Sequence, residues 1–344
     1  MLILSEQESL AQYTTFKIGG PAAYFAEPES DEEVREAIAF AEEKQLPVVV
    51  LGGGSNVLIA DQGFPGLVLH MANKEITWTT EGETTLAVSD AGVAWDFFVS
   101  ECVMRGLWGV EALSGIPGTI GGGIVQNVGA YGKEVAECIE WVEVYDPVTE
   151  VIRRLDRASC HFAYRDSVFK HEEGKHLIIL RAAFQLKKNG APALNYKDLV
   201  EYDKNEKPIQ TLGDVREAIL AIRARKFPDL RTIGTAGSFF KNPIVSNTVR
   251  DVLMKRYPDA PHYPVDEAHT KLSAAWIIDH VLKMRGVSEG HVGSWEGQAL
   301  VLITDTKATA EEVTQFASKI ISACMEKTNI LLEAEVIFVG DIKK

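Results

Sequence analysis

The sequence predicts an α+β protein of two or three domains, for three reasons. At 344 residues the chain is too long for one ordinary core. Helical and strand-like patterns alternate near both ends, whereas the middle of the chain is mostly strands and turns. Hydrophobic residues make up 46% and charged residues 24%, which is typical of a globular protein. We expect three parts, at 1–70, 71–212 and 213–329, with a last strand in 330–344 that joins the first part.

The first part has the pattern of a strand–helix–strand unit. Ser30 to Glu33 form a capping box, and apolar residues follow it at helical spacing. Short strands are expected at 48–51 and 57–59, joined by the loop Gly52-Gly53-Gly54-Ser55-Asn56. This loop connects a strand to a strand, so it differs from the strand-to-helix glycine fingerprint of a dinucleotide Rossmann fold.

The middle part is expected to hold one helix, over Trp95–Arg105, and several strands. The strand-like segments are 84–89, 141–146, 151–155 and 177–186. Between them lies the stretch 107–135, which is rich in glycine and shows no periodicity. Such a stretch inside a compact domain is usually a ligand loop.

The last part returns to helices. Capping residues predict helices that begin at Asp214 and at Thr309, and a third helix is expected over 271–284. A strand over 330–339 is expected to close the chain.

Charge and composition argue against several functions. The formal charge of −14 is opposite to the basic footprint of nucleic-acid-binding proteins. No stretch approaches the roughly 20 apolar residues that cross a bilayer, and the N-terminal sequence lacks the basic region of a secretion signal. The four cysteines show no CxxC spacing and the histidines no zinc spacing. We therefore expect a cytoplasmic protein with reduced, mostly buried thiols, no metal and no membrane or nucleic-acid partner.

Two glycine-rich loops predict a phosphate-binding site. The first is Gly52–Asn56, and the second runs over Gly115–Gly123 and continues through Gln126–Gly132. Glycines at this density let the backbone approach a ligand, so that successive N–H groups converge on a pyrophosphate. Tight turns are the alternative explanation for either loop alone, but two such loops in one acidic chain favour ligand binding.

Six motifs, in order along the chain, give it a resemblance to a known family. They are TFKIGG at 15–20, LGGGSN at 51–56, IPGTIGG…QNVGAYG at 116–132, YRDSVFK at 164–170, GSFFKNP at 237–243 and EAEV at 333–336. In content and order they resemble the UDP-N-acetylenolpyruvoylglucosamine reductases (MurB). The resemblance extends over nearly the whole chain.

The resemblance implies an FAD-binding fold of the vanillyl-alcohol-oxidase (PCMH) type in two subdomains, followed by a C-terminal α/β substrate domain. It also implies non-covalent FAD, NADPH as electron donor and UDP-N-acetylglucosamine enolpyruvate as substrate, with UDP-N-acetylmuramate, a peptidoglycan precursor, as product. The YRDSVFK segment and the stretch 195–199 imply the subtype with a tyrosine loop over the substrate. We expect a monomer. The implied FAD contacts are Gly52, Gly53, Gly54, Ser55, Asn56, Ile116, Pro117, Gly118, Thr119, Gly121, Gly122, Gln126, Asn127, Gly129, Ala130 and Tyr131.

The resemblance also implies three catalytic residues, and their chemistry suits the reaction. Reduction of an enolpyruvyl ether needs a hydride donor, stabilisation of the charge that develops on the carboxylate, and a proton donor. Ser238 follows small residues and precedes Phe239-Phe240, so a turn is expected to present its hydroxyl against an apolar wall, and this hydroxyl is expected to give the proton. Arg165 is expected to bind the carboxylate bidentately. Glu335, in an apolar strand, is expected to donate a proton or hydrogen bond to the enediolate. Glu333 shares its face and could be its partner or simply be solvated.

Four residues are expected to bind the UDP-sugar. The resemblance places Lys226 and Asn242 on the diphosphate and Tyr196 over the nucleotide. Without the resemblance, Lys226 would be interpreted as a solvated cation at the end of a helix. Gln298 is a weaker assignment, because the residues before it depart from the basic sequence that the family pattern leads us to expect.

Two other functions compete with the reductase. A flavin-dependent oxidase or dehydrogenase of a small alcohol would need a base near the flavin and no acid at Ser238. A nucleotide-binding module without activity would have lost catalytic positions, yet Arg165, Ser238 and Glu335 are all present. The flavin spectrum and its reoxidation by the enolpyruvyl sugar separate the three functions.

Overall fold

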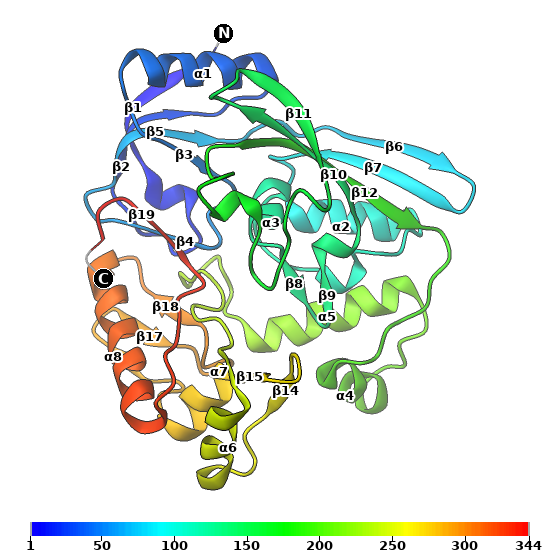
Figure 1. The fold of residues 1–344 in the computed structure, drawn as a ribbon, viewed down its shortest axis with the longest axis vertical. Coiled ribbons are helices and arrows are strands. Elements are labelled where there is room, and N and C mark those ends of the chain that lie inside the picture. Colours follow the sequence, from blue (N-terminus) through cyan, green and yellow to red (C-terminus); the bar gives the residue numbers. More distant parts are fainter. Residues whose placement is uncertain (1, 343–344) are drawn as a thin grey trace. The chain divides into compact units, whose positions relative to one another are not determined.

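The computed structural model describes residues 2–342, and the chain forms two compact units (Figure 1). Unit 1 contains Ala22–Gly53, Pro65–Ala224 and the stretch before Ser9. Unit 2 contains Ser9–Pro21, Gly54–Phe64 and the chain from Arg225 onward. Each unit is therefore assembled from separate stretches of sequence.

The first sheet of unit 1 carries the helix predicted after Ser30. Helix α1 (Asp31–Glu43) starts where Ser30 Oγ accepts a hydrogen bond from the Glu33 amide at 3.2 Å, so the predicted cap is confirmed. The sheet has the order β1-β2-β5-β3, with β3 parallel to β5. Its strands are β1 (Leu4–Ser9), β2 (Pro21–Ala26), β3 (Val48–Leu51) and β5 (Phe64–His70).

The second sheet of unit 1 is antiparallel, with the order β11-β10-β12-β7-β6, and confirms the strands predicted for the middle of the chain. Its strands are β6 (Ile76–Glu81), β7 (Thr84–Asp90), β10 (Ile139–Asp146), β11 (Val151–Asp156) and β12 (Ile178–Lys187). Helix α2 (Trp95–Met104) is also confirmed. It packs on β12 through Phe98, whose ring centroid lies 4.6 Å from that of Phe184.

The expectation of an aperiodic loop over 107–135 is wrong in part. The stretch contains helix α3 (Ile120–Val125), two 3₁₀ turns (Glu111–Leu113 and Val135–Glu137) and the hairpin of β8 (Gly129–Ala130) and β9 (Lys133–Glu134). Glycine is needed in α3 for close packing, because a Cβ on Gly123 would lie 3.0 Å from the Trp95 ring. The residues therefore form a helix of low propensity that tertiary contacts stabilise.

Two further helices complete unit 1, namely α4 (Lys197–Asn205) and α5 (Leu212–Lys226). Helix α5 starts before Asp214, so the predicted start is wrong. Thr211 Oγ1 accepts a hydrogen bond from the Asp214 amide at 3.2 Å, and the Asp214 carboxylate accepts one from the Thr211 amide at 2.9 Å. Asp214 is thus the last of the four residues of a capping box that Thr211 begins.

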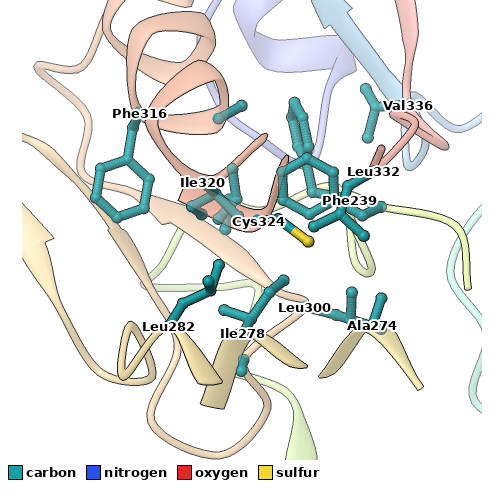
Figure 2. Close-up of a cluster of buried hydrophobic side chains, with 14 of the residues drawn as sticks. Phe239, Ala274, Ile278, Leu282, Leu300, Phe316, Ile320, Cys324, Leu332 and Val336 are labelled. Atoms are coloured by element: carbon teal, nitrogen blue, oxygen red, sulfur yellow. The ribbon is translucent and has the colours of Figure 1, made fainter. Parts of the chain in front are cut away.

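Unit 2 packs helices on small sheets around one large apolar cluster. Its helices are α6 (Asn247–Arg256), α7 (Ala274–Trp276) and α8 (Ala310–Thr328), and the predicted capping box of Thr309 and Glu312 is confirmed. Figure 2 shows α8 side chains facing Ile278, Leu282 and Leu332 in this cluster. The strands are β4 (Val57–Ile59), β13 (Ile244–Ser246), β14 (His262–Pro264), β15 (His269–Leu272), β16 (Ser288–Glu289), β17 (Val292–Ser294), β18 (Leu302–Thr304) and β19 (Ile337–Val339).

Two element boundaries predicted for unit 2 are wrong. The helix expected over 271–284 begins only at Ala274, because Lys271 and Leu272 belong to β15; it continues as a π-helix over Ile277–Val281. The strand expected over 330–339 is regular only in β19, which pairs in parallel with β4. Before it, Ala334 pairs with Phe240. The segment changes partner between these pairings, which interrupts the strand.

Among the described residues, no helix is long and apolar enough to span a bilayer, and no three metal-ligating side chains gather into a metal site.

All four cysteines are buried, as predicted, and form no disulfide. Burial raises the pKa of Cys138 to about 11 and that of Cys160 to about 12. These thiols are therefore protonated and poorly reactive.

Candidate active site

In unit 1 the two glycine loops touch each other, as their predicted common role requires. A Cβ on Gly53 would lie 2.7 Å from the Cα of Gly118, and one on Gly52 would lie 2.6 Å from Thr119 Oγ1. No side chain fits between the loops at these positions. The two backbones therefore pack directly against each other, and we call this pair of loops, whose N–H groups could converge on a phosphate, the glycine cradle.

The cradle also contains a hydroxyl group that lacks a protein partner. Thr119 Oγ1 is buried and makes no hydrogen bond within residues 2–342. A buried polar atom without a partner costs free energy, so such an atom is commonly explained by a missing ligand or water. The close-packed glycines and this hydroxyl fit a cofactor that carries phosphate groups.

Helix α5 fixes the start of the second glycine loop, a role that the sequence analysis missed. The Asp96 carboxylate accepts a hydrogen bond from the Gly115 amide at 2.5 Å and is itself held by Arg216 Nη1 and Nη2 at 2.6 and 2.9 Å. Arg223 Nε donates to the Gly115 carbonyl at 2.9 Å. Burial lowers the pKa of Arg223. The sequence did contain a signal for this role, because Arg216 and Arg223 are seven residues apart and therefore lie on one face of the helix.

After α3, the Asn127 side chain bonds to neighbouring segments of the protein. Asn127 is fully buried, and its side-chain amide donates to the Ala163 carbonyl at 2.8 Å and to the Glu134 carboxylate at 2.9 Å. Its Oδ1 accepts from the Ala136 amide at 3.1 Å. Both donors of this side chain are thus committed, and the backbone N–H of Asn127 donates to the Ile124 carbonyl at 3.1 Å, so every N–H group of this residue has a protein partner.

Tyr131 and Tyr196 lie together in unit 1. Their ring centroids are 5.2 Å apart at 75°, which is an edge-to-face contact. Burial raises the pKa of Tyr131 to about 12. Tyr196 remains 42% exposed, so its ring can still be covered by another group.

Arg165 stands at a tight turn whose backbone directs its side chain. Ala163 and Asp166 exchange two backbone hydrogen bonds of 3.0 Å, and Arg165 between them has a φ of 55°. Its Nη2 donates to the Gly129 carbonyl at 2.6 Å, and its guanidinium carbon lies 5.1 Å from the centre of the Tyr164 ring. The arginine that was predicted to bind a carboxylate therefore lies against the hairpin that follows the second glycine loop.

In unit 2 Ser238 follows a glycine turn and precedes two buried phenylalanines, as predicted. Gly237 has a φ of 74°, and its amide bonds to Thr235 Oγ1 at 3.1 Å. The Phe239 amide donates to the Leu300 carbonyl at 2.8 Å, and its ring is buried in the cluster of Figure 2. Ser238 is thus fixed on both sides by rigid backbone and is itself half-buried.

The segment that contains Glu335 pairs with the segment that follows Ser238, in the same unit. The Glu335 amide donates to the Phe239 carbonyl at 2.8 Å, and the Glu335 carbonyl accepts from Asn56 Nδ2 at 3.3 Å. Glu335 is half-buried, whereas Glu333 is exposed. The structure therefore separates the two glutamates and places Glu335 next to the first glycine loop.

The remaining predicted residues of unit 2 have defined surroundings. Gly54 has a φ of 60°, and a Cβ on it would lie 1.9 Å from the Tyr13 carbonyl oxygen, so glycine is required there. Asn242 Oδ1 accepts a hydrogen bond from the Ala274 amide at 3.0 Å. Lys226 is the last residue of α5, as predicted. The Gln298 carbonyl accepts a hydrogen bond from the Val301 amide at 3.0 Å, and Val301 is the residue with which Ser238 forms an isolated β-bridge.

The predicted site residues therefore fall into two groups. Unit 1 holds the cradle, the residues after α3, Arg165 and Tyr196. Unit 2 holds Gly54–Asn56 with Ser238 and Glu335, together with Lys226, Asn242 and Gln298.

Two family models match separate parts of the chain. A model of an FAD binding domain matches residues 22–154, and a model of the UDP-N-acetylenolpyruvoylglucosamine reductase C-terminal domain matches residues 228–339. The first match includes both glycine loops, and the second includes Ser238 and Glu335. The fold and the cradle together define an FAD-binding oxidoreductase with the α+β, vanillyl-alcohol-oxidase type of fold, which confirms the predicted fold class.

Relatives along the whole chain carry one description. UDP-N-acetylenolpyruvoylglucosamine reductase of Photobacterium profundum is 38% identical over 344 residues, which cover 100% of this chain and 98% of the relative. That of Pseudomonas aeruginosa is 38% identical over 97% of this chain and 98% of the relative. The crystal structure of the Thermus caldophilus enzyme (MurB) has a TM-score of 0.68 at 24% identity, with 99% of each chain covered. The chain belongs to the UDP-N-acetylenolpyruvoylglucosamine reductase family.

Proposed function

We propose that Ser238, Arg165 and Glu335 carry out the reduction of the enolpyruvyl group of UDP-N-acetylglucosamine enolpyruvate. As a member of its family, the chain is an FAD-containing, NADPH-dependent oxidoreductase that forms UDP-N-acetylmuramate for peptidoglycan synthesis. The observation that supports the assignment of residues is the backbone hydrogen bond from Glu335 to Phe239, because Phe239 directly follows Ser238 and the two segments are therefore paired.

The glycine cradle is proposed to hold FAD without a covalent bond. Gly52, Gly53, Gly118 and Gly122 would present backbone to the pyrophosphate, and the Thr119 hydroxyl would gain the partner that it lacks within the described residues. The other predicted contacts, at 54–56, 116–117, 121, 126–127 and 129–131, are proposed as its surroundings. When bound, FAD supplies hydride chemistry, since a flavin can accept a hydride from NADPH and release it in a second half-reaction.

Arg165 is proposed to bind the substrate carboxylate. A guanidinium gives a carboxylate two parallel hydrogen bonds, and their strength increases as negative charge develops there. The left-handed backbone at Arg165 supports this role, because strained conformations of non-glycine residues persist mainly where function requires a fixed direction.

Ser238 and Glu335 are proposed to manage the proton and the charge of the enediolate. The Ser238 hydroxyl would give its proton to the substrate carbon that bears the ether oxygen. The Glu335 carboxyl would donate a proton or hydrogen bond to the enediolate oxygen. A general acid must stay within hydrogen-bond reach of its target. The rigid backbone on either side of these residues supports both assignments, because it holds the side chains in place.

Four side chains are proposed to hold the UDP-sugar. The side-chain oxygen of Asn242 accepts a hydrogen bond from the Ala274 amide, so the side-chain NH₂ group is the part that would face a diphosphate. Lys226 would add a cation, Gln298 a second amide, and Tyr196 an exposed ring over the nucleotide. The edge-to-face contact with Tyr131 supports the proposed tyrosine-loop subtype.

Three further properties are proposed. The matches at 22–154 and 228–339 support an FAD-binding part followed by a substrate part, for which we propose the bounds 1–70 and 71–212 and then 213–329. The buried thiols and the nucleotide substrates favour a cytoplasmic protein. A monomer is proposed because no residue of the site requires a second copy.

Rapid-mixing absorbance of the flavin tests the proposed activity. NADPH should bleach the flavin in the absence of sugar, and the enolpyruvyl sugar should then restore its colour under anaerobic conditions. An oxidase would instead be bleached by an alcohol and recover with oxygen. A protein that binds UDP-sugars but contains no flavin would be a binding module, and the proposed function would be wrong.

A further inference from the structure

The turn at Arg165 is held by a residue to which no role has yet been assigned. Arg165 has the left-handed φ of 55°, which L-residues with a Cβ rarely adopt. Its side chain is therefore directed by a backbone conformation that its neighbours must stabilise. Lys170, five residues further on, makes the contact that bears most directly on this backbone.

Lys170 binds the turn through its ammonium group. Its Nζ donates to the Arg165 carbonyl at 2.9 Å and to Gln126 Oε1 at 3.1 Å. Gln126 directly follows α3, and Lys170 ends the 3₁₀ helix Val168–Lys170. The ammonium thus connects the carbonyl of the strained residue to a fixed point beside the second glycine loop.

Two buried contacts hold the rest of the segment against the same point. Ser167 Oγ donates to the Val125 carbonyl at 2.7 Å, and Asn127 Nδ2 donates to the Ala163 carbonyl at 2.8 Å. Both side chains are fully buried. These contacts fix the ends of the turn. In the peptide unit that follows Arg165, the Asp166 amide donates to the Ala163 carbonyl and Lys170 holds the Arg165 carbonyl, and rotation of that unit would redirect the guanidinium.

We propose that Lys170 is a positioning residue, which holds Arg165 in its left-handed conformation so that the guanidinium meets the substrate carboxylate. The inference rests on the proposed function, since it takes Arg165 as the carboxylate-binding residue. If Lys170 merely stabilised the fold, its loss would affect all ligands alike. A positioning role affects only ligands that carry the carboxylate.

Binding of two UDP-sugars to the oxidised, flavin-loaded protein separates these cases. UDP-N-acetylmuramate carries the lactyl carboxylate and UDP-N-acetylglucosamine lacks it, so the ratio of their dissociation constants measures carboxylate recognition. Calorimetric titration gives both dissociation constants. In Lys170→Met their ratio should be about tenfold closer to one than in the unaltered protein, because the charged hydrogen bonds of Lys170 are lost. Affinity for UDP-N-acetylglucosamine should not change.

Three other variants complete the test. Arg165→Ala should abolish the carboxylate preference, and Lys170→Arg, which keeps charged donors, should retain most of it. Lys188→Met is the matched control, because Lys188 also donates to a backbone carbonyl, that of Gly82 at 2.9 Å, at a distant hairpin turn. It should leave the ratio unchanged. If Lys170→Met does not retain flavin, Lys170→Gln takes its place.

The outcomes distinguish this inference from the proposed function. An unchanged ratio in Lys170→Met, together with a lost preference in Arg165→Ala, would overturn the positioning role alone. Equal weakening of both sugars in Lys170→Met would also overturn it. A preference that survives in Arg165→Ala would refute the carboxylate-binding role of Arg165, and the role of Lys170 would fail with it.

Discussion

The side-chain carbonyl oxygen of Asn242 accepts a hydrogen bond from the Ala274 amide at 3.0 Å, at the start of α7. This contact fixes the orientation of the side-chain amide, because the oxygen is committed to the protein and the NH₂ group must point away from it. A donor is what a diphosphate requires. The contact thus links the folding of α7 to the diphosphate recognition proposed for Asn242.

The substitution Asn242→Asp tests this link. An aspartate can accept the same hydrogen bond from Ala274, so the melting temperature and flavin content should be preserved. The donor is replaced by a negatively charged oxygen, so affinity for UDP-N-acetylglucosamine should fall by at least about tenfold in calorimetric titration. Asn242→Ala is the contrast, since it should also lower stability. Unchanged affinity in Asn242→Asp would exclude Asn242 from diphosphate binding.

Ser238→Ala should impair one half-reaction only. NADPH should still bleach the flavin at the unaltered rate, since that step requires no proton from Ser238. Reoxidation by the enolpyruvyl sugar should slow by about 10²–10⁴-fold, the usual contribution of general-acid catalysis. Rapid-mixing absorbance measures both steps, and exposed Ser288, as Ser288→Ala, serves as control. Equal slowing of the two steps would contradict the role of Ser238.

A pair of glutamate variants tests which carboxyl serves the enediolate. Glu335→Gln should show the same one-sided defect as Ser238→Ala, because it removes the acidic proton and keeps the shape of the side chain. Glu333→Gln is the matched control, since Glu333 lies two residues away and is exposed. It should behave like the unaltered protein. Reoxidation at the normal rate in Glu335→Gln, or a defect in Glu333→Gln, would reverse the assignment.

Gly53→Ala should abolish FAD retention. The added Cβ would lie 2.7 Å from the Cα of Gly118. Neither atom can move without its backbone, so the two loops would have to separate. Flavin absorbance per protein after gel filtration measures the effect. Gly213→Ala, within α5, is the control, because its Cβ would lie 3.8 Å from the nearest atom, Thr211 Oγ1. A Gly53→Ala variant with full flavin content would show that the cradle is not the phosphate site.

Features fixed by short-range interactions could be predicted from the sequence. The helix starts at Ser30 and Thr309 depend on a side chain and an amide three residues apart, so the pattern alone reveals them. The turn before Ser238 was likewise indicated by small residues ahead of two phenylalanines. The motifs then supplied the roles of these residues, which no local pattern contains.

Features fixed by contacts distant in sequence could not be predicted. Helix α3 forms from glycines only because Trp95 and Ala91 pack directly on them. Asn127 was assigned to FAD, yet its side chain holds a turn 36 residues away. Arg216 and Arg223 were overlooked because their partners, Asp96 and Gly115, lie 120 and 108 residues earlier in the chain.

Glu143→Gln should destabilise the protein in a pH-dependent way. The Glu143 carboxylate accepts hydrogen bonds from Arg154 Nε at 2.8 Å and from Arg181. Burial alone would raise the pKa of Glu143, but the two arginines outweigh it and hold the pKa below its ordinary value. Removal of the charge should cost about 2 kcal/mol of unfolding free energy at neutral pH.

The sign of the pH dependence follows from the lowered pKa. The charged hydrogen bonds contribute fully above the pKa of the unfolded chain, about 4.3, and their contribution is lost as the pH falls through the lower pKa of the folded state. The difference in unfolding free energy between the unaltered protein and Glu143→Gln, from denaturant titrations, should therefore shrink on acidification. Glu140→Gln, at an exposed position of the same strand, should show no difference at any pH. A difference for Glu143→Gln that stayed constant down to acid pH would mean that packing, and not charge, explains the loss.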